Sequence, residues 1–130
     1  MLAFSRVGLI PDSGTTWTLP RLVGYARAYE MAVTADRIPA EKALAWGMVN
    51  QVVPHEQLMD VVAAWSTTLA TGPTLAYALT KRAMSRGAVS DLEQALAYES
   101  LLQEIAGRSH DSQEGIQAFL EKREAQFKGE

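Results

Sequence analysis

The second half of the chain has the hydrophobic spacing of amphipathic helices. From His55 on, apolar side chains recur three and four positions apart, which places them on one side of an α-helix. The first stripe consists of Leu58, Val61, Val62, Trp65 and Leu69. Gly72-Pro73 ends it, and the next helix is predicted from about Thr74 to Arg86, with Gly87 at its end. Its inward-facing residues are predicted to be Leu75, Ala78, Leu79 and Ala83.

Two further helices are predicted after Gly87. Ser90 and Glu93 have the spacing of a capping box, with Ser at the cap and Glu three residues later. Asp111 and Glu114 repeat this spacing. The apolar residues that follow the two caps are Leu92, Ala95, Leu96, Leu102 and Ile105 in one helix and Ile116, Phe119 and Leu120 in the other. The chain is therefore expected to end in three or four helices that depend on packing for stability.

Residues 1–54 mix extended and helical patterns. The apolar run at Val7, Leu9 and Ile10 favours a short strand that stops at Pro11, and residues 48–53 favour another that stops at Pro54. Helices are predicted over residues 15–24, 25–35 and 40–46, and Ala28, Met31 and Ala32 share a core face. Tyr25, Tyr29 and Met31 could line an acyl pocket, but a packed core is the favoured prediction for aromatic residues at helical spacing. The fold class is therefore mainly α, with one or two short strands.

Composition and charge narrow the class of protein. A chain of 130 residues with 48% hydrophobic and 21% charged residues fits one soluble globular domain with a modest core. A net charge of −3 argues against a DNA or RNA partner, since phosphates require clustered Lys and Arg. No cysteine, membrane-spanning run or signal peptide is present, so we expect a cytoplasmic location. His55 and His110 have no ligand-spaced partners, so no metal site is predicted.

Asp12 is the strongest chemical candidate in the sequence. It follows an apolar run and Pro11, and Asp12-Ser13-Gly14 have the composition of a helix start. Asp is a favoured N-cap residue because its side-chain oxygen accepts from an unpaired N–H of the first turn. The same carboxylate beside apolar residues could also move a proton. Local chemistry alone favours the cap.

Four blocks of sequence then resemble the crotonase (enoyl-CoA hydratase/isomerase) superfamily, in the family's own order. They are Phe4 to Gly24, with Gly8-Leu9-Ile10-Pro11 and Leu19-Pro20-Arg21-Leu22-Val23-Gly24; Ile38 to Val53; Lys81 within an Ala- and Leu-rich helix; and Asp111 to Arg123. The first block is most similar to the ring-1,2-epoxyphenylacetyl-CoA isomerase-like members. Together the blocks cover nearly the whole chain.

The resemblance implies a particular place in the crotonase fold. Residues 1–72 resemble the end of the family's core, and residues 73–130 its C-terminal helical oligomerisation region. Family members are considerably longer, and their N-terminal half carries most of the spiral β-sheet and the N–H groups that hold the thioester oxygen. Met1 thus resembles an internal start. The resemblance also implies a homo-oligomer, a trimer or a dimer of trimers in the complete enzyme.

The resemblance assigns roles to six residues. Asp12 is implied to be the acid–base residue of an acyl-CoA isomerase, beside a substrate pocket that includes Phe4, Ile10 and Trp17. Hydratases of the family carry a Glu where Phe4 stands, so hydration is the less favoured activity. Coenzyme A enters only as part of the substrate, with Lys122 a candidate for its phosphates and Phe119 for apolar contact. The alternatives are a solvated Lys122, a core Phe119, and a chain that is only a helical assembly module or inactive.

Overall fold

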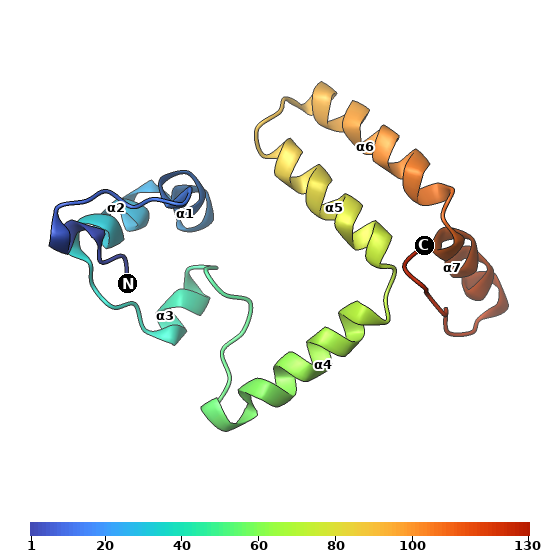
Figure 1. Cartoon of the computed structure of the whole chain (residues 1–130), viewed down its shortest axis with the longest axis horizontal. Helices are drawn as coiled ribbons and strands as arrows, with labels where there is room; N and C mark the ends of the chain where they lie inside the picture. Colours follow the sequence, from blue (N-terminus) through green and yellow to red (C-terminus); the bar gives the residue numbers. More distant parts are fainter. The chain divides into compact units, whose positions relative to one another are not determined.

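A computed structural model describes residues 1–130, and every regular element in it is a helix (Figure 1). The α-helices are α1 (Thr15–Val23), α2 (Tyr25–Thr34), α3 (Ala40–Ala45), α4 (Leu58–Ala70), α5 (Thr74–Gly87), α6 (Leu92–Gly107) and α7 (His110–Glu121). Two 3-10 helices, η1 (Phe4–Val7) and η2 (His55–Gln57), complete the set. The mainly α fold class is therefore confirmed. No helix is long and apolar enough to cross a membrane.

The contacts divide the chain into two compact units, Met1–Glu56 and Gln57–Glu130. The division falls just before α4. The sequence places its boundary after residue 72, at the other end of that helix, and the functional meaning of that boundary stays a prediction. Each unit is described separately below.

The two predicted strands are wrong. Residues 4–7 form η1, which ends at Gly8 in the left-handed conformation at φ 73°, and the Leu9 N–H donates to the Phe4 carbonyl at 3.0 Å. Residues 48–53 form no strand either, and the Met48 N–H bonds back to the Ala43 carbonyl at 2.9 Å. A strand needs a neighbouring strand to satisfy its backbone groups. The chain supplies no such neighbour, so these N–H groups bond locally.

The core of the first unit lies between α1 and α2. Its buried side chains are Leu19, Val23, Ala28 and Met31, with Leu2, Ile38, Trp46 and Met48 packed around them. Ala28 and Met31 therefore occupy the predicted core face, and Ala32 is half-buried beside them. Gly24 joins the two helices at φ 86° and ψ 153°, a conformation open to glycine because it has no Cβ. This glycine is the single residue between α1 and α2.

In the second unit, α5 and α6 lie side by side as an antiparallel pair (Figure 1). Leu79 and Leu102 are their buried residues. The predicted helix starts are each displaced from the observed cap. Asp91, not Ser90, caps α6 by accepting from the Gln94 N–H at 2.8 Å, and Ser109, not Asp111, caps α7 by accepting from the Ser112 N–H at 3.0 Å.

The helix α4 forms as predicted, but its apolar stripe is not covered. No residue of α4 is buried, and Trp65 and Leu69 keep 54% and 51% of their surface exposed. A helix of 13 residues is marginal in water without a packed face. The hydrophobic spacing thus predicts the helix correctly, whereas burial of the stripe requires a surface that the contacts within this chain do not provide.

Candidate active site

Asp12 lies between η1 and the first turn of α1, but it does not cap that helix. Gly14 occupies the cap position, and no side chain bonds to the first-turn N–H groups. Ser13 and Gly14 both adopt the left-handed conformation, at φ 53° and 78°, and turn the backbone between Asp12 and α1. The Asp12 carbonyl, rather than its carboxylate, accepts from the Thr15 N–H at 2.9 Å. The predicted capping role of the Asp12 side chain is therefore wrong.

The carboxylate of Asp12 is exposed and makes few contacts. The Ser13 hydroxyl donates to its Oδ1 at 3.1 Å, and it forms no ion pair. A carboxylate that is committed neither to a cap nor to a cation can accept a proton without breaking the local structure. The site thus retains the one chemical group that the sequence singles out.

An apolar hollow adjoins the same turn. It has a volume of about 220 Å³ and lies between α1 and α2, and Pro11 and Thr15, on either side of the Asp12 turn, belong to its wall. Tyr25 and Tyr29 form the opposite side, with their rings stacked at a centroid distance of 6.0 Å and an interplanar angle of 7°. Both tyrosines are well exposed, at 74% and 59%, so they belong to the hollow rather than to the core.

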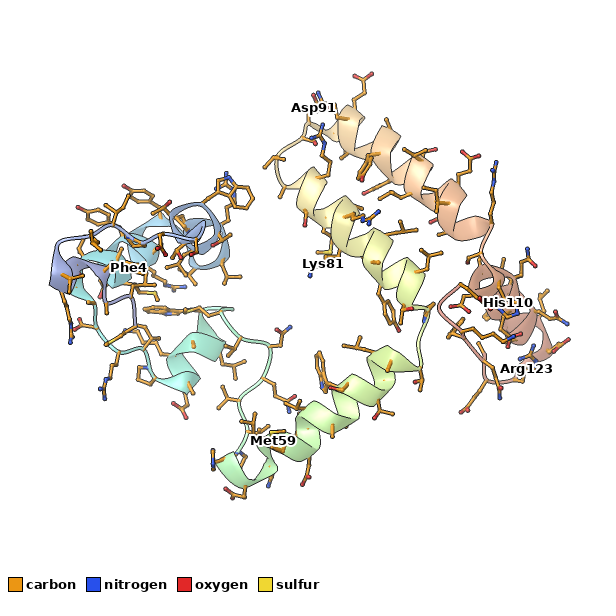
Figure 2. The ribbon with its side chains drawn as sticks, viewed as in Figure 1. Phe4, Met59, Lys81, Asp91, His110 and Arg123 are labelled. Carbon is orange, nitrogen blue, oxygen red and sulfur yellow. The ribbon has the colours of Figure 1, made fainter.

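The other predicted pocket residues do not line this hollow. Phe4 is half-buried in η1 (Figure 2), whereas Ile10 is 79% exposed. Trp17 is engaged with Arg21, whose guanidinium lies 3.9 Å from the ring centroid and donates to the Trp17 carbonyl at 2.8 Å. Pro20 and Thr16 do line the hollow, although the sequence pattern gave no reason to select them. Thr16 and Pro20 line the hollow only because of the way α1 and α2 pack together.

Phe119 and Lys122 lie together at the end of α7, in the second unit. Phe119 is 82% exposed, so it does not belong to a core, and Lys122 is exposed as well. Lys122 ends the helix in the left-handed conformation, at φ 55° and ψ 39°, and makes no ion pair. An apolar hollow of about 430 Å³ adjoins this end of the helix, with Ile116, Phe119, Leu120 and Phe127 in its wall. The exposed ring of Phe119 thus lines a concave surface, and Lys122 follows it at the end of the helix without belonging to the wall.

The carboxylates of Asp111 and Glu114 bind the residues after Lys122. From the sequence alone, these two residues are predicted only to mark the start of a helix. The guanidinium of Arg123 lowers the pKa of Glu114 from its ordinary 4.5 to about 2, aided by the Gln126 N–H. Burial acts to raise the pKa of Asp111, but hydrogen bonds from the Lys128 and Gly129 N–H groups outweigh it, so its pKa lies below the ordinary value. These partners are far apart in the sequence, so local sequence patterns do not predict the contacts between them.

Comparison with known proteins places the whole chain in one sequence class. The family model described as "Enoyl-CoA hydratase/isomerase" matches residues 1–130. The chain is 45% identical over 129 residues to the "1,2-epoxyphenylacetyl-CoA isomerase" of Escherichia coli, covering 99% of this chain and 49% of that protein. It is 46% identical to the "Probable enoyl-CoA hydratase" of Rhodobacter capsulatus, covering 99% of this chain and 50% of that protein.

Solved structures agree with the sequence relatives. The crystal structure of an enoyl-CoA hydratase from Bacillus anthracis aligns with a TM-score of 0.89 at 37% identity, covering 97% of this chain and 49% of that one. The helices described above are therefore those of a larger known fold. The chain spans about half the length of the curated relatives it matches.

Proposed function

Since the chain belongs to the enoyl-CoA hydratase/isomerase family, we propose that it forms part of an acyl-CoA isomerase in which Asp12 moves the proton. The observation that carries the proposal is the unpaired carboxylate of Asp12 beside an apolar hollow. The substrate is an aromatic or unsaturated acyl thioester of coenzyme A. Coenzyme A is required only as part of that substrate.

The chemistry asked of Asp12 is a proton transfer within the acyl chain. The carboxylate takes a proton from a carbon that is activated by the thioester, and the electron pair moves to the thioester oxygen as an enolate. The protonated carboxyl group then returns the proton to another carbon, and the double bond shifts. The enolate oxygen needs N–H donors, a role that the family resemblance gives to the N-terminal half of the longer members.

The hollow beside Asp12 supports a compact apolar acyl group. Its volume of about 220 Å³ is below the range of roughly 300–1,000 Å³ typical of sites for whole ligands. It therefore fits one end of a substrate, such as a single ring. The stacked Tyr25 and Tyr29 rings offer apolar faces against which an aromatic group can pack.

Isomerisation is proposed ahead of hydration because of Phe4. Addition of water by two carboxylates requires a second acidic side chain, and an aromatic residue stands where the family's hydratases carry Glu. Overall identity does not decide between the activities, because relatives named for each are 45% and 46% identical to the chain.

A second candidate function is helical assembly without catalysis. It is favoured by the uncovered apolar stripe of α4, which is more extensive than isolated surface leucines would be. In this reading the chain contributes an oligomer contact, and a second copy of the chain covers the stripe. The two candidates differ in whether the chain binds an acyl-CoA.

The deciding experiment is isomerase turnover of a 3-enoyl-CoA by this chain, with circular dichroism of the same sample to establish that it is folded. Asp12→Asn should abolish turnover, because the amide cannot accept the proton. Asp36→Asn serves as the matched control, since Asp36 is also an exposed carboxylate of the first unit. Full turnover by Asp12→Asn would refute the acid–base role, and a folded but inactive parent chain would mean that it is a structural part of an isomerase whose enolate-holding N–H donors lie outside it.

A further inference from the structure

The end of α7 contains a lysine in an unfavourable backbone conformation. Lys122 has φ 55°, where glycine is usual at the end of a helix because other residues bring Cβ too close to the backbone. Its N–H donates to the Phe119 carbonyl at 3.3 Å, and the Arg123 N–H donates to the Ala118 carbonyl at 3.1 Å. These two bonds are those of a Schellman motif. Some other contact must therefore offset the cost of placing lysine there.

The next residue supplies that contact. Arg123 Nη1 and Nη2 donate to the two oxygens of Glu114 at 2.6 and 2.9 Å, and Arg123 Nε donates to Glu121 Oε2 at 2.6 Å. A planar guanidinium bound to both oxygens of one carboxylate has a fixed orientation. Figure 2 shows Arg123 beside α7, and in the sequence Arg123 directly follows Lys122. The backbone of Lys122 is thus fixed by the helix before it and by the anchored Arg123 after it.

The remaining residues of the tail are held to the same helix. The carboxylate of Asp111 is only 3% exposed and accepts from the Lys128 and Gly129 N–H groups at 2.7 and 2.8 Å. The Asp111 N–H in turn donates to the Glu130 carbonyl at 2.9 Å. Glu114 also accepts from the Gln126 N–H at 2.9 Å. Residues 123–130 are therefore fastened along the first turns of α7 rather than left free.

The consequence is an unpaired cation on a backbone of defined conformation. The ammonium of Lys122 has no carboxylate partner, while the neighbouring Arg123 is fully engaged. One turn earlier, the ring of Phe119 is exposed at the apolar hollow. This combination suits a ligand that carries both a phosphate and a flat apolar group.

Building on the proposed acyl-CoA function, we propose that Glu114 and Arg123 are positioning residues for substrate binding. Their ion pair holds Lys122 in its left-handed conformation and so directs its ammonium to a phosphate of coenzyme A. Glu114 and Arg123 do not touch the ligand. Their effect on binding passes entirely through Lys122.

The test is a double-mutant cycle on binding by this chain, measured by calorimetry. Lys122→Ala should weaken binding of an acyl-CoA by about tenfold, the loss expected for one charge-assisted hydrogen bond. Glu114→Gln should weaken it several-fold in the same direction, and the double variant should bind no more weakly than Lys122→Ala alone. The matched acyl-pantetheine thioester, which lacks the phosphates, should bind all variants and the parent equally.

A control ion pair separates positioning from loss of surface charge. Glu104 pairs with Arg108 at the exposed C-terminal end of α6, and Glu104→Gln should leave binding of both thioesters unchanged. The Cα chemical shift of Lys122 provides a direct structural readout, because it reports the left-handed conformation. It should move toward its unfolded value in Glu114→Gln and stay unchanged in Glu104→Gln.

Four results would overturn the positioning role. They are additive losses in the double variant, an equal loss for the pantetheine thioester, an unchanged Lys122 shift in Glu114→Gln, and full acyl-CoA binding by Glu114→Gln when Lys122→Ala binds weakly. Failure of the proposed function looks different, because the parent chain would then bind neither thioester. That outcome would refute both proposals together, whereas the four results above leave acyl-CoA binding intact.

Discussion

Replacing Lys122 by glycine should stabilise the chain while it weakens ligand binding. The left-handed conformation at φ 55° costs a residue with a Cβ about 1–2 kcal/mol, a cost that glycine does not carry. Glycine also makes the unfolded chain more flexible, which offsets roughly 0.4–1 kcal/mol of the gain. The midpoints of these two ranges leave a net increase in the free energy of unfolding of about 0.8 kcal/mol. For a chain of 130 residues this corresponds to a rise in Tm of roughly 2–4 °C.

The matched variant for this experiment is Lys122→Ala. Both substitutions remove the ammonium, but only glycine removes the Cβ, so their difference isolates the backbone cost. Thermal unfolding followed by circular dichroism measures that difference, and amide hydrogen exchange in α7 locates it within the second unit. Lys122→Ala should unfold close to the temperature of the parent. The reasoning would be refuted if Lys122→Gly were no more stable than Lys122→Ala.

Three other predictions concern pH, the tail and α4. Arg123 lowers the pKa of Glu114 from 4.5 to about 2, so their contact stabilises the tail fully above pH 4.5 and loses this effect as pH falls toward 2. Amide exchange of the tail, measured as the pH is lowered, should show this loss in the parent chain and not in Glu114→Gln. Gly129→Ala should destabilise the attachment of the tail by about 1–2 kcal/mol, because φ is 83° and the new Cβ would lie 2.5 Å from Thr74 Oγ1. Faster amide exchange at position 129 is the expected result, and unchanged exchange would contradict it. Amides of α4 should exchange faster than those of α5 because α4 buries nothing, and equal protection would mean that its stripe is covered.

The sequence predicts the helices well because their signals are local. Hydrophobic spacing and breaks at glycine and proline place α4, α5, α6 and α7 close to their observed bounds. Cap positions are less secure, because Ser90 and Asp91 are adjacent and both residue types cap well. The backbone conformation at Ser90 and Asp91 determines which of the two is the cap, and residue type alone does not predict that conformation.

Features that depend on residues far apart in the sequence could not be predicted from it. The runs at residues 7–10 and 48–53 have strand composition, but a strand also needs a partner, and none is present in this chain. The Glu114–Arg123 pair spans nine positions, which no helical or strand period selects. The hollow between α1 and α2 likewise depends on packing rather than on a motif.

The two candidate sites share one feature, a residue other than glycine in the left-handed backbone conformation. It occurs at Ser13, Ala35 and Lys122. Ala35 has a packing explanation, since it is completely buried and its carbonyl accepts from Arg6 Nη2 at 3.1 Å. Ser13 and Lys122 are exposed, so burial does not offset their cost. One of them turns the carboxylate of Asp12 away from the cap, and the other presents an unpaired ammonium. At Lys122 the Arg123–Glu114 contact offsets the cost, whereas no contact of Ser13 beyond its bond to Asp12 does so. Strain without a structural explanation is expected where a sequence is constrained by function, and this favours a functional role for the turn at Asp12.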